Sequence, residues 1–414
     1  MKILTITSHI SSNALPCFQR NKTGFGYMVH DIVTSLVSKG NEVDVLVFWY
    51  RFKRLQLDGA NYLPCSLWII FLNIFRCLPV RFFGRLLRRY RIPNGHKVRL
   101  LYCWTLTGYY RSLIKNGRYD IVHIHGCGIH EDLWIRTCQQ LGQRYIVTLH
   151  GLNSFNETVS IGESAKRYER DFLHEVIMGE HQITVISTGI KNRILAAENL
   201  SESKYIDVVC NSFKFDDAKS VFIDIRKLHN VPDDANVLLY VGNIGRNKNQ
   251  QQLIEVFPLL QAEIRNNTYV LFIGVDSDEV DMQRLIEVSP CSDHFIYIGG
   301  IEKSQISSYY KNATATVLLS FSEGFGLSLL EAMHFGVPCA MFTDMDAYAD
   351  LYNPCAIVGI PTRRNEDVAH SIEKLLTSKW NKKDIQLHAE KFNSDSMADN
   401  YLRVFQSLIE QPST

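Results

Sequence analysis

The sequence has 414 residues, of which 46% are apolar and 21% are charged, and its formal net charge is +1. This composition is typical of a globular protein, and it argues against fibrous, disordered and broadly nucleic-acid-binding chains. Because one hydrophobic core rarely serves more than about 300 residues, the length predicts two domains.

The N-terminal segment MKILTITSHI predicts a buried first strand. Its apolar residues alternate with threonine and serine, so it lacks the unbroken apolar segment of a signal peptide. The ten cysteines are scattered without a Cys-x-x-Cys pair, which is typical of a reducing cytosol. The most apolar run, Cys65 to Phe75, is about half the roughly 20 residues that cross a bilayer. We therefore expect a cytoplasmic protein.

Short segments rich in Val and Ile recur in the first half between stretches with helical spacing. This pattern is typical of strands buried on both faces of a parallel sheet. A helix is predicted from about Tyr27 to Ser38, ended by Gly40. Residues 1–212 are thus expected to form one doubly wound, Rossmann-like domain. Its predicted strands are KILTITS, EVDVLVF, DIVHIHG, RYIVTLHG, ITVIS and IDVVC.

Residues 51–99 form a basic amphipathic insert in this domain. They contain eleven Lys or Arg and one acid, a net charge of +10 that leaves −9 for the rest of the chain. In LPVRFFGRLLRRYRIP, apolar side chains are interleaved with arginines, which is typical of a helix on an anionic membrane. The alternative is a helical hairpin that buries its apolar face on the first domain. We take membrane contact as the working prediction.

The second half repeats the alternation of strands and helices after a less regular stretch. Residues 213–235 are predicted to be a linker, and 236–390 a second doubly wound domain. Residues 391–414 carry apolar positions at helical spacing and are predicted to form a closing helix that returns toward the first domain. The predicted strands are NVLLYVGN, TYVLFIG, HFIYIGG, ATVLLS and VPCAMF.

The segment FSEGFGLSLLEAM places a glycine turn between a strand and a helix that carries Glu331 one turn in. Free amides and the helix dipole at such a position attract an anion, and the glycines allow its close approach. Glu331 then suits the hydroxyls of a ribose, while Glu323 lies on the other side of the phosphates. The pattern fits a nucleotide-sugar ligand, and two solvated helix-end charges beside turn-forming glycines would account for the spacing equally well.

The segment SFSEGFGLSLLEAMHFGVPCA resembles the signature of retaining glycosyltransferases of family four. The resemblance extends through TGFGYMVHDIVTSLVSKGNEVDVL, DIVHIHG, VTLHG, ITVIS, VVCNS and VGNIGRNKNQQQLIEVF. It implies the GT-B fold, in which two Rossmann-like domains face each other across a cleft. It also implies a bacterial-type hexosyltransferase that moves a sugar from a nucleotide-diphosphate donor to a glycan or lipid-linked saccharide, without a metal or another cofactor.

The resemblance assigns roles to the residues of the acidic turn. In the family, the first acid contacts hydroxyls of the donor sugar and the second holds the ribose. These acids correspond to Glu323 and Glu331. The amides of Phe325, Gly326 and Leu327 are implied to bind the diphosphate.

The resemblance also assigns roles in the first loop of the second domain. Lys248 corresponds to the family's lysine, which we place with Glu323 in catalysis, and Gly242 corresponds to its glycine. The arginine that usually follows this glycine is replaced by Asn243, and Arg246 is the nearest residue to supply the missing charge. Without the resemblance, Lys248 would be interpreted as a solvated loop lysine.

In the first domain, His150 corresponds to the family histidine near the donor sugar, and we include it among the catalytic residues. Gly24 and Gly26 resemble a glycine loop that faces the diphosphate and acceptor. A histidine at the end of a strand is more often structural. His123 and His125 share one strand face, and we leave them outside the predicted site.

Sugar transfer builds negative charge on the leaving phosphate and oxocarbenium-like charge on the sugar. Lys248, Arg246 and the turn amides would stabilise the leaving group. Retention is implied by the family alone, and we expect front-face attack by the acceptor hydroxyl. Asp344 and Asp346 have the spacing of a metal-binding pair, but a solvated loop is the preferred interpretation.

Two alternatives remain open for the function, and two others are disfavoured. A GT-B sugar-nucleotide epimerase would act on the donor alone, and an inactive sugar- or lipid-binding protein would follow from the missing arginine at Asn243. A phosphorylase requires a pyridoxal lysine for which we find no motif. A nicotinamide-dependent dehydrogenase is disfavoured because no GxGxxG follows the first strand. We expect a UDP-sugar before a GDP-sugar, a role in surface polysaccharide such as lipopolysaccharide or capsule, and no nucleic-acid partner.

Overall fold

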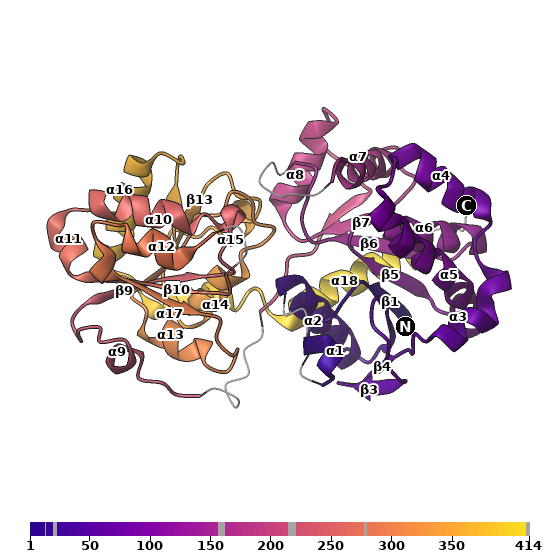
Figure 1. Cartoon of the computed structure of the whole chain (residues 1–414), viewed down its shortest axis with the longest axis horizontal. Coiled ribbons are helices and arrows are strands. Elements are labelled where there is room, and N and C mark those ends of the chain that lie inside the picture. Colours follow the sequence, from indigo (N-terminus) through magenta and orange to yellow (C-terminus); the bar gives the residue numbers. More distant parts are fainter. Residues whose placement is uncertain (13, 20–22, 156–161, 214–220, 277–279, 411–414) are drawn as a thin grey trace. The chain divides into compact units, whose positions relative to one another are not determined.

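The computed structural model describes residues 1–12, 14–19, 23–155, 162–213, 221–276 and 280–410. The chain divides into two compact units (Figure 1). Unit 1 comprises Met1–Ser212 and Ser394–Thr414, and unit 2 comprises Phe213–Asn393.

Unit 1 is built on an eight-stranded sheet of order β3-β4-β2-β1-β5-β6-β7-β8. All its pairings are parallel except that of β3 with β4, a hairpin that the sequence pattern did not predict. The predicted doubly wound parallel sheet is confirmed. The strands are β1 Lys2–Thr7, β2 Glu42–Val47, β3 Leu55–Leu57, β4 Ala60–Tyr62, β5 Ile121–His125, β6 Tyr145–Leu149, β7 Ile183–Val185 and β8 Ile206–Val208.

The strand order of unit 1 reverses between β1 and β5, which pair side by side. Right-handed crossovers that lead in opposite directions place their helices on opposite faces of the sheet. The helices are α1 Pro16–Gln19, α2 Gly24–Ser38, α3 Leu67–Asn73, η1 Ile74–Arg76, α4 Val80–Tyr90, α5 Asn94–Gly117, α6 Ile129–Leu141, α7 Glu163–Ile177, α8 Thr188–Ala197 and α18 Ser394–Glu410.

The C-terminal helix α18 belongs to unit 1, although nearly two hundred residues of unit 2 precede it. It packs on α2, and Lys39 after α2 forms ion pairs with Asp395 and Asp399 at 3.4 and 2.9 Å. The rings of Tyr401 and Phe405 lie 5.1 and 5.2 Å from that of His123 on β5. The amphipathic spacing of this helix therefore serves the core of unit 1.

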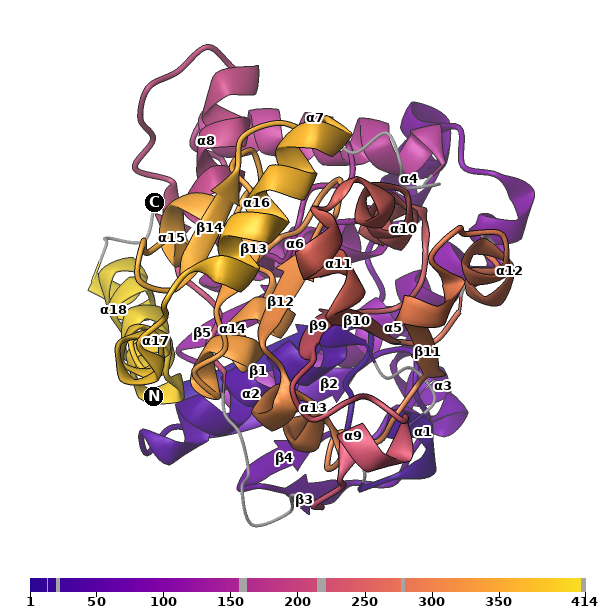
Figure 2. The ribbon, with the colours of Figure 1, turned by 90° about the vertical axis from the view of Figure 1, so that its left-hand side faces the viewer.

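Unit 2 has a six-stranded parallel sheet of order β11-β10-β9-β12-β13-β14, which can be followed across Figure 2. Its order reverses between β9 and β12, so the loops that follow these strands emerge side by side. The strands are β9 Asn236–Val241, β10 Thr268–Ile273, β11 Phe295–Gly299, β12 Ala315–Leu318, β13 Cys339–Phe342 and β14 Ile357–Ile360.

Helices cover both faces of this second sheet, with α10, α12 and α16 on one side and α13, α14 and α17 on the other (Figure 1). The helices are α9 Ile225–Leu228, η3 Arg246–Lys248, α10 Gln250–Val256, η4 Phe257–Leu259, α11 Ala262–Asn266, α12 Met282–Glu287, η5 Ser292–His294, α13 Ile306–Asn312, α14 Leu327–His334, α15 Tyr348–Leu351, α16 Asn365–Thr377 and α17 Lys382–Ala389.

The described part of the predicted linker is packed on unit 2. The amide of Val221 donates to the carbonyl oxygen of Ser304 at 2.9 Å, and that of Ile223 donates to Ser308 Oγ at 2.9 Å. The helix α9 follows and contacts α13. Residues 214–220 of the predicted linker and 411–414 of the predicted closing segment lie outside the described residues.

The basic insert 51–99 contains β3, β4, α3, η1, α4 and the start of α5. Ile70, Leu86 and Tyr90 are buried, so part of its apolar surface packs on unit 1 as the hairpin alternative required. Within the described residues, no single helix is long and apolar enough to cross a membrane. The segments Leu67–Arg76 and Val80–Tyr90 together reach that length and composition, but a bend of 101° separates them.

The insert is held on α5 by a close crossing at Gly108. A Cβ atom at Gly108 would lie 2.1 Å from the carbonyl oxygen of Asn73, so only glycine fits. Beside the crossing, the indole of Trp104 donates to the carbonyl oxygen of Leu78 at 2.8 Å, and the amide of Leu78 donates to Thr107 Oγ1 at 3.0 Å. The backbone of residues 73–78 therefore rests directly on the helix.

We expect Gly108→Ala to lower the free energy of unfolding of unit 1 by about 1–3 kcal/mol, because the methyl group forces the insert away from α5. Gly84→Ala on α4 is the matched control, because a Cβ atom there meets nothing within 4 Å. The control should gain up to about 1 kcal/mol from helix propensity. Calorimetric unfolding of both variants provides the measurement. Equal stabilisation by both substitutions would contradict the crossing.

Candidate functional site

The loops that follow β9 and β12 are joined by hydrogen bonds. The amide of Phe321 donates to the carbonyl oxygen of Asn247 at 2.8 Å, and the side-chain amide of Asn247 donates to the carbonyl oxygen of Ser322 at 2.9 Å. Asn249 adds a bond from Nδ2 to the carbonyl oxygen of Leu319 at 3.3 Å. These bonds link residues more than 65 positions apart, and they make the two loops one structure.

Beneath these loops, the buried hydroxyl of Tyr240 on β9 connects both of them. It accepts a hydrogen bond from the amide of Leu319 at 2.9 Å and donates one to the carbonyl oxygen of Lys248. Burial raises the pKa of Tyr240 above its ordinary value, so the hydroxyl remains a donor at neutral pH. The backbone of Lys248 is thereby fixed relative to the end of β12.

The ammonium of Lys248 forms an ion pair with Oε2 of Glu323. Ser320 Oγ donates to the same carboxylate oxygen at 3.4 Å. At Gly242, a Cβ atom would lie 3.6 Å from Cε of Lys248, so the lysine stem passes over this glycine. Three residues predicted from separate motifs, Lys248, Glu323 and Gly242, are thus brought together.

The helix α14 begins at Leu327 with its N-terminus at this cluster. Its N-cap, Gly326, has φ of 79°, a left-handed conformation that favours glycine. Among the described residues, the amides of Phe325, Gly326 and Leu327 donate to no other group. The ring of Phe325 is buried and lies 5.8 Å from that of Phe392, which anchors the turn. This is the geometry of an anion-binding helix start.

One turn further along α14, the carboxylate of Glu331 is oriented by Tyr310 on α13. The phenol hydroxyl of Tyr310 donates to Oε2 of Glu331 at 2.9 Å. Burial raises the pKa of Tyr310 well above its ordinary value, which keeps it protonated. The sequence pattern did not single out Tyr310, because it lies outside the motif, 21 positions before Glu331.

The loop after β9 contains both Asn243, which replaces the family arginine, and Arg246, the candidate to supply the missing charge. Arg246 is exposed, and its side chain makes no hydrogen bond or ion pair with another described residue. Asn243 is also exposed, while its carbonyl oxygen accepts from Gln250 Nε2 at 3.1 Å. The buried Gln250 also reaches the carbonyl oxygen of Gly242 at 3.3 Å, and so shapes this loop.

Sequence reasoning missed Arg363, which follows β14. Its guanidinium donates to the carbonyl oxygens of Ser320 and Phe321 at 3.0 and 3.3 Å. It also pairs with Asp344 at 2.9 Å and lies 4.2 Å from the ring centroid of Phe342. The sequence does contain a pattern that could have indicated this arginine. The apolar segment IVGIP, typical of a buried strand, is followed directly by the basic segment TRR. Asp344 is therefore an ion-pair partner of an arginine beside the acidic turn.

In unit 1, His150 follows β6 and contacts a histidine that the sequence interpretation set aside. His150 Nε2 and His125 Nδ1 share a hydrogen bond at 3.0 Å. The ring of Phe25 lies edge-on to His150 at 4.8 Å. Burial lowers the pKa of His150 to about 3 and that of His125 well below its ordinary value. Both rings are consequently neutral at pH 7.

Gly24 and Gly26 do not form the expected loop, so that part of the prediction is wrong, while their role in donor binding stays a prediction. Both lie in the first turn of α2, which begins three residues before the predicted Tyr27. The physical reason is Thr23, an N-cap whose Oγ1 accepts from the amide of Gly26 at 3.1 Å. A Cβ atom at Gly26 would lie 2.3 Å from Ser11 Oγ, so this glycine permits close packing.

Two family models match the chain in succession. "Glycosyltransferase Family 4" matches residues 23–213, and "Glycosyl transferases group 1" matches residues 221–392. Together they cover most of both units.

The curated relatives are distant in sequence. The O-antigen chain mannosyltransferase B of Escherichia coli is 23% identical over 241 residues, which cover 58% of this chain and 63% of that protein. A glycosyltransferase of Methanocaldococcus jannaschii is 22% identical over 408 residues, which cover 93% of this chain and 95% of that protein.

Solved structures share the fold of the whole chain. Sucrose-phosphate synthase from Thermosynechococcus elongatus has a TM-score of 0.71 at 16% identity, with 98% of each chain covered. The Anabaena protein HepE, in complex with UDP and glucose, has a TM-score of 0.65 at 14% identity, with 98% of this chain and all of that one covered. At these identities, the likeness establishes the fold.

We expect Tyr240→Phe to destabilise unit 2 by about 1–3 kcal/mol, because the buried amide of Leu319 loses its acceptor. The looser loop should also shift the amide resonances of residues around Lys248. Tyr269→Phe on the neighbouring β10 is the control, since the Tyr269 hydroxyl bonds to no described residue. The measurements are the unfolding free energies and the amide chemical shifts of both variants. If Tyr240→Phe and Tyr269→Phe gave the same values, Tyr240 would not bridge the two loops.

We expect the stability of unit 1 to fall as the pH decreases below about 6.5. Burial lowers the pKa of His123 to about 3, so the unfolded chain binds a proton in this range that the folded state does not. Each such proton lowers the free energy of unfolding by about 1.4 kcal/mol for every pH unit by which the pH falls. His123→Gln should therefore flatten the pH dependence of the unfolding free energy by about this amount between roughly pH 6 and 4. An unchanged slope would show that His123 titrates normally in the fold.

Proposed function

The chain belongs to glycosyltransferase family 4 and has its GT-B fold, and on that premise we propose that it is a retaining hexosyltransferase. It would move a sugar from a nucleotide-diphosphate donor to a glycan or lipid-linked saccharide. One observation carries the assignment. The Lys248–Glu323 ion pair lies beside unpaired amides at the start of α14, one turn from the oriented Glu331.

Each of these groups matches one part of such a donor. The amides of Phe325, Gly326 and Leu327, with the helix dipole, would bind the diphosphate. The carboxylate of Glu331, held by Tyr310, would accept hydrogen bonds from two ribose hydroxyls. Arg246, three residues after Asn243, would compensate for the missing arginine, together with Arg363, which bonds to the carbonyl oxygens of Ser320 and Phe321. Gly242 leaves room for the Lys248 stem.

The reaction breaks the bond between the anomeric carbon and the phosphate oxygen and forms one to the acceptor oxygen. The acceptor proton passes to the leaving phosphate oxygen. Lys248 would stabilise the negative charge on that phosphate, and Glu323 would hold hydroxyls of the donor sugar. Before the donor binds, Lys248 and Glu323 neutralise each other's charge through their ion pair. Each half-buried charge therefore has a partner in the unliganded enzyme.

The residues of unit 1 take the remaining proposed roles. His150, neutral because of burial, would hydrogen-bond a sugar hydroxyl rather than supply a charge. At the start of α2, Gly24 would present its backbone amide toward the diphosphate and acceptor, while Gly26, whose amide donates to Thr23 Oγ1, would allow the close packing of this turn. The hydrogen bond to His125 orients the His150 ring for this task.

For the donor we favour a UDP-sugar over a GDP-sugar, because the HepE structure, which shares this fold, contains UDP and glucose. For the acceptor, the name of the Escherichia coli relative supports surface polysaccharide, as in lipopolysaccharide or capsule synthesis. A lipid-linked acceptor would lie at a membrane surface. The basic insert 51–99 would bring the enzyme to that surface as a peripheral protein.

Two alternatives from other classes remain. A sugar-nucleotide epimerase would convert the donor without an acceptor, which a donor-only incubation followed by sugar analysis would reveal. An inactive sugar- or lipid-binding protein is favoured by one observation, the replacement of the family arginine by Asn243.

Calorimetric titration with UDP, GDP, ADP and their sugar conjugates should show binding of one nucleotide series. Glu331→Ala should weaken that binding about 10- to 100-fold, since it removes two charge-assisted hydrogen bonds. Lys248→Ala and Glu323→Gln should bind the nucleotide but lose about 10²- to 10³-fold in kcat. Glu263→Gln, an exposed acid in the first turn of α11, is the matched control and should behave like the wild type.

Binding of no nucleotide series would move the inactive-protein alternative to first place. Near-full turnover by all three site variants would remove the site assignment while leaving the family intact.

A further inference from the structure

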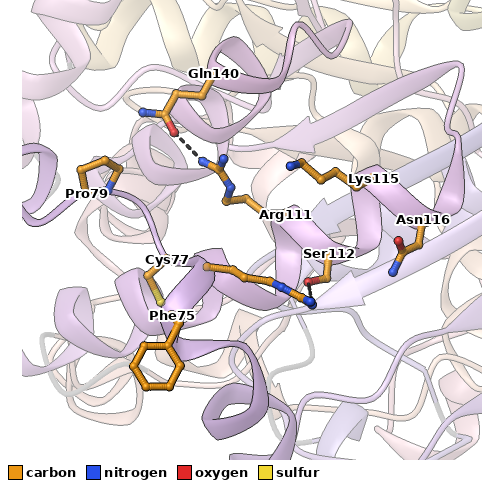
Figure 3. A pocket seen from close by; sticks show the side chains of 9 residues that line it. Phe75, Cys77, Pro79, Arg111, Ser112, Lys115, Asn116 and Gln140 are labelled. Atoms are coloured by element: carbon orange, nitrogen blue, oxygen red, sulfur yellow. Dashed lines mark hydrogen bonds between the residues drawn. The ribbon is translucent and has the colours of Figure 1, made fainter.

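A pocket of about 540 Å³ lies on unit 1, between η1 of the insert and the last turns of α5 and α6 (Figure 3). Three cations line it, Arg76, Arg111 and Lys115, together with polar groups that include Ser112 and Gln140. None of the lining residues is an acid. A concave site with this charge selects anions.

The charges of these cations are not neutralised by their neighbours. The guanidinium of Arg111 donates to Gln140 Oε1 at 2.6 Å, and that of Arg76 donates to Ser112 Oγ at 3.0 Å (Figure 3). Both partners are uncharged, so they orient the guanidinium groups and leave their charge available. Lys115 forms no ion pair with a described residue, and α5 contains no acid along its whole length.

Beside the pocket, α3 and η1 expose an apolar strip made of Trp68, Phe71, Leu72 and Phe75. Trp68 is 76% exposed and Phe75 is 100% exposed. Their spacing of three or four residues places them on one helix face, whereas Ile70 on the other face is buried. Large apolar groups gathered in this way mark an interaction surface. Phe75 belongs to both the strip and the pocket lining, which makes the two features continuous.

We propose that this continuous surface binds an anionic phospholipid bilayer, with one phosphate headgroup in the pocket and the apolar strip in the acyl layer. The ligand must combine a phosphate with hydrocarbon at a fixed short distance, and a phospholipid does so. The adjoining α4 adds exposed Arg81 and Arg85, which suit the anionic surface around the bound headgroup. Indole and phenyl rings beside cations are typical of the bilayer interface.

The headgroup site lies away from the predicted catalytic groups of unit 1. Helix α5 ends at Gly117, just before β5 begins at Ile121, so the pocket is near the amino-terminal edge of the sheet. His125 and His150 lie at the opposite, carboxyl-terminal edge. The bound lipid is therefore an anchor and not the sugar acceptor. The inference rests on the membrane association proposed above and is independent of sugar transfer.

Flotation of the full-length protein with vesicles tests this proposal. Vesicles of phosphatidylcholine with phosphatidylglycerol should carry the protein, and vesicles of phosphatidylcholine alone should carry much less. The pocket variant, Arg111→Gln with Lys115→Gln, should bind the anionic vesicles about 25-fold more weakly, at about fivefold for each cation lost near the surface. The strip variant, Trp68→Ser with Phe71→Ser, should lose binding to a similar or greater extent.

The matched control is Arg403→Gln with Lys204→Gln, which removes one arginine and one lysine charge from exposed positions elsewhere in unit 1, on α18 and in the turn before β8. It should float like the wild type, and all variants should retain the nucleotide binding and unfolding temperature of the wild type. If the pocket variant floats like the wild type, the headgroup site is overturned. If the strip variant floats like the wild type, insertion of the apolar strip into the acyl layer is overturned.

Titration with inorganic phosphate distinguishes a soluble ligand. One outcome is that the wild-type protein binds phosphate but does not float with vesicles, and that the pocket variant no longer binds phosphate. This outcome would assign the pocket to a soluble phosphate compound and overturn the lipid proposal. Because flotation does not depend on the donor, vesicle binding without nucleotide binding would contradict only the glycosyltransferase function. Nucleotide binding without vesicle binding would contradict only the membrane proposal.

Discussion

The candidate site depends on the hydrogen bonds of one buried hydroxyl. Tyr240 joins the backbone of Lys248 to the end of β12, and this bond sets where the lysine and Glu323 meet. The contact is possible because the strand order of unit 2 reverses between β9 and β12, which brings their loops together. A polar group in that position must be fully hydrogen-bonded or it costs stability, and here both its donor and acceptor functions are used.

Unit 1 uses buried polar groups in a different way. The side chain of His123 bonds to Thr148 at 2.6 Å, and Thr148 bonds to Thr184 at 2.6 Å, so a chain of hydrogen bonds crosses three strands. Helix α18 covers this row with Tyr401 and Phe405, which lowers the pKa of His123 through burial. The C-terminal helix thus contributes to the environment in which the neighbouring His125 and His150 stay neutral.

The basic insert satisfies two opposing physical demands. Its backbone must be held firmly, and the contact at Gly108 with the indole of Trp104 achieves this on α5. Its apolar strip nevertheless remains exposed, and the contact of apolar surface with water is unfavourable in an isolated protein. A rigid attachment and an unburied apolar face are both explained if a lipid surface covers that face.

The sequence by itself determined the parallel, doubly wound sheets and the acidic turn, because apolar runs, glycine turns and motif spacing are local properties. It also indicated Lys248, Glu323 and Gly242 through their resemblance to family motifs. Tertiary structure alone decided that Tyr310 orients Glu331, that Arg363 lies on the acidic turn and that His125 contacts His150. It also showed that Gly24 and Gly26 begin a helix, since the Thr23 cap outweighed the glycine pattern. The side-chain contacts join residues that are 21 to 43 positions apart, and the helix start depends on a single hydrogen bond. Strand order brings such distant residues together, and it is not a local property of the chain.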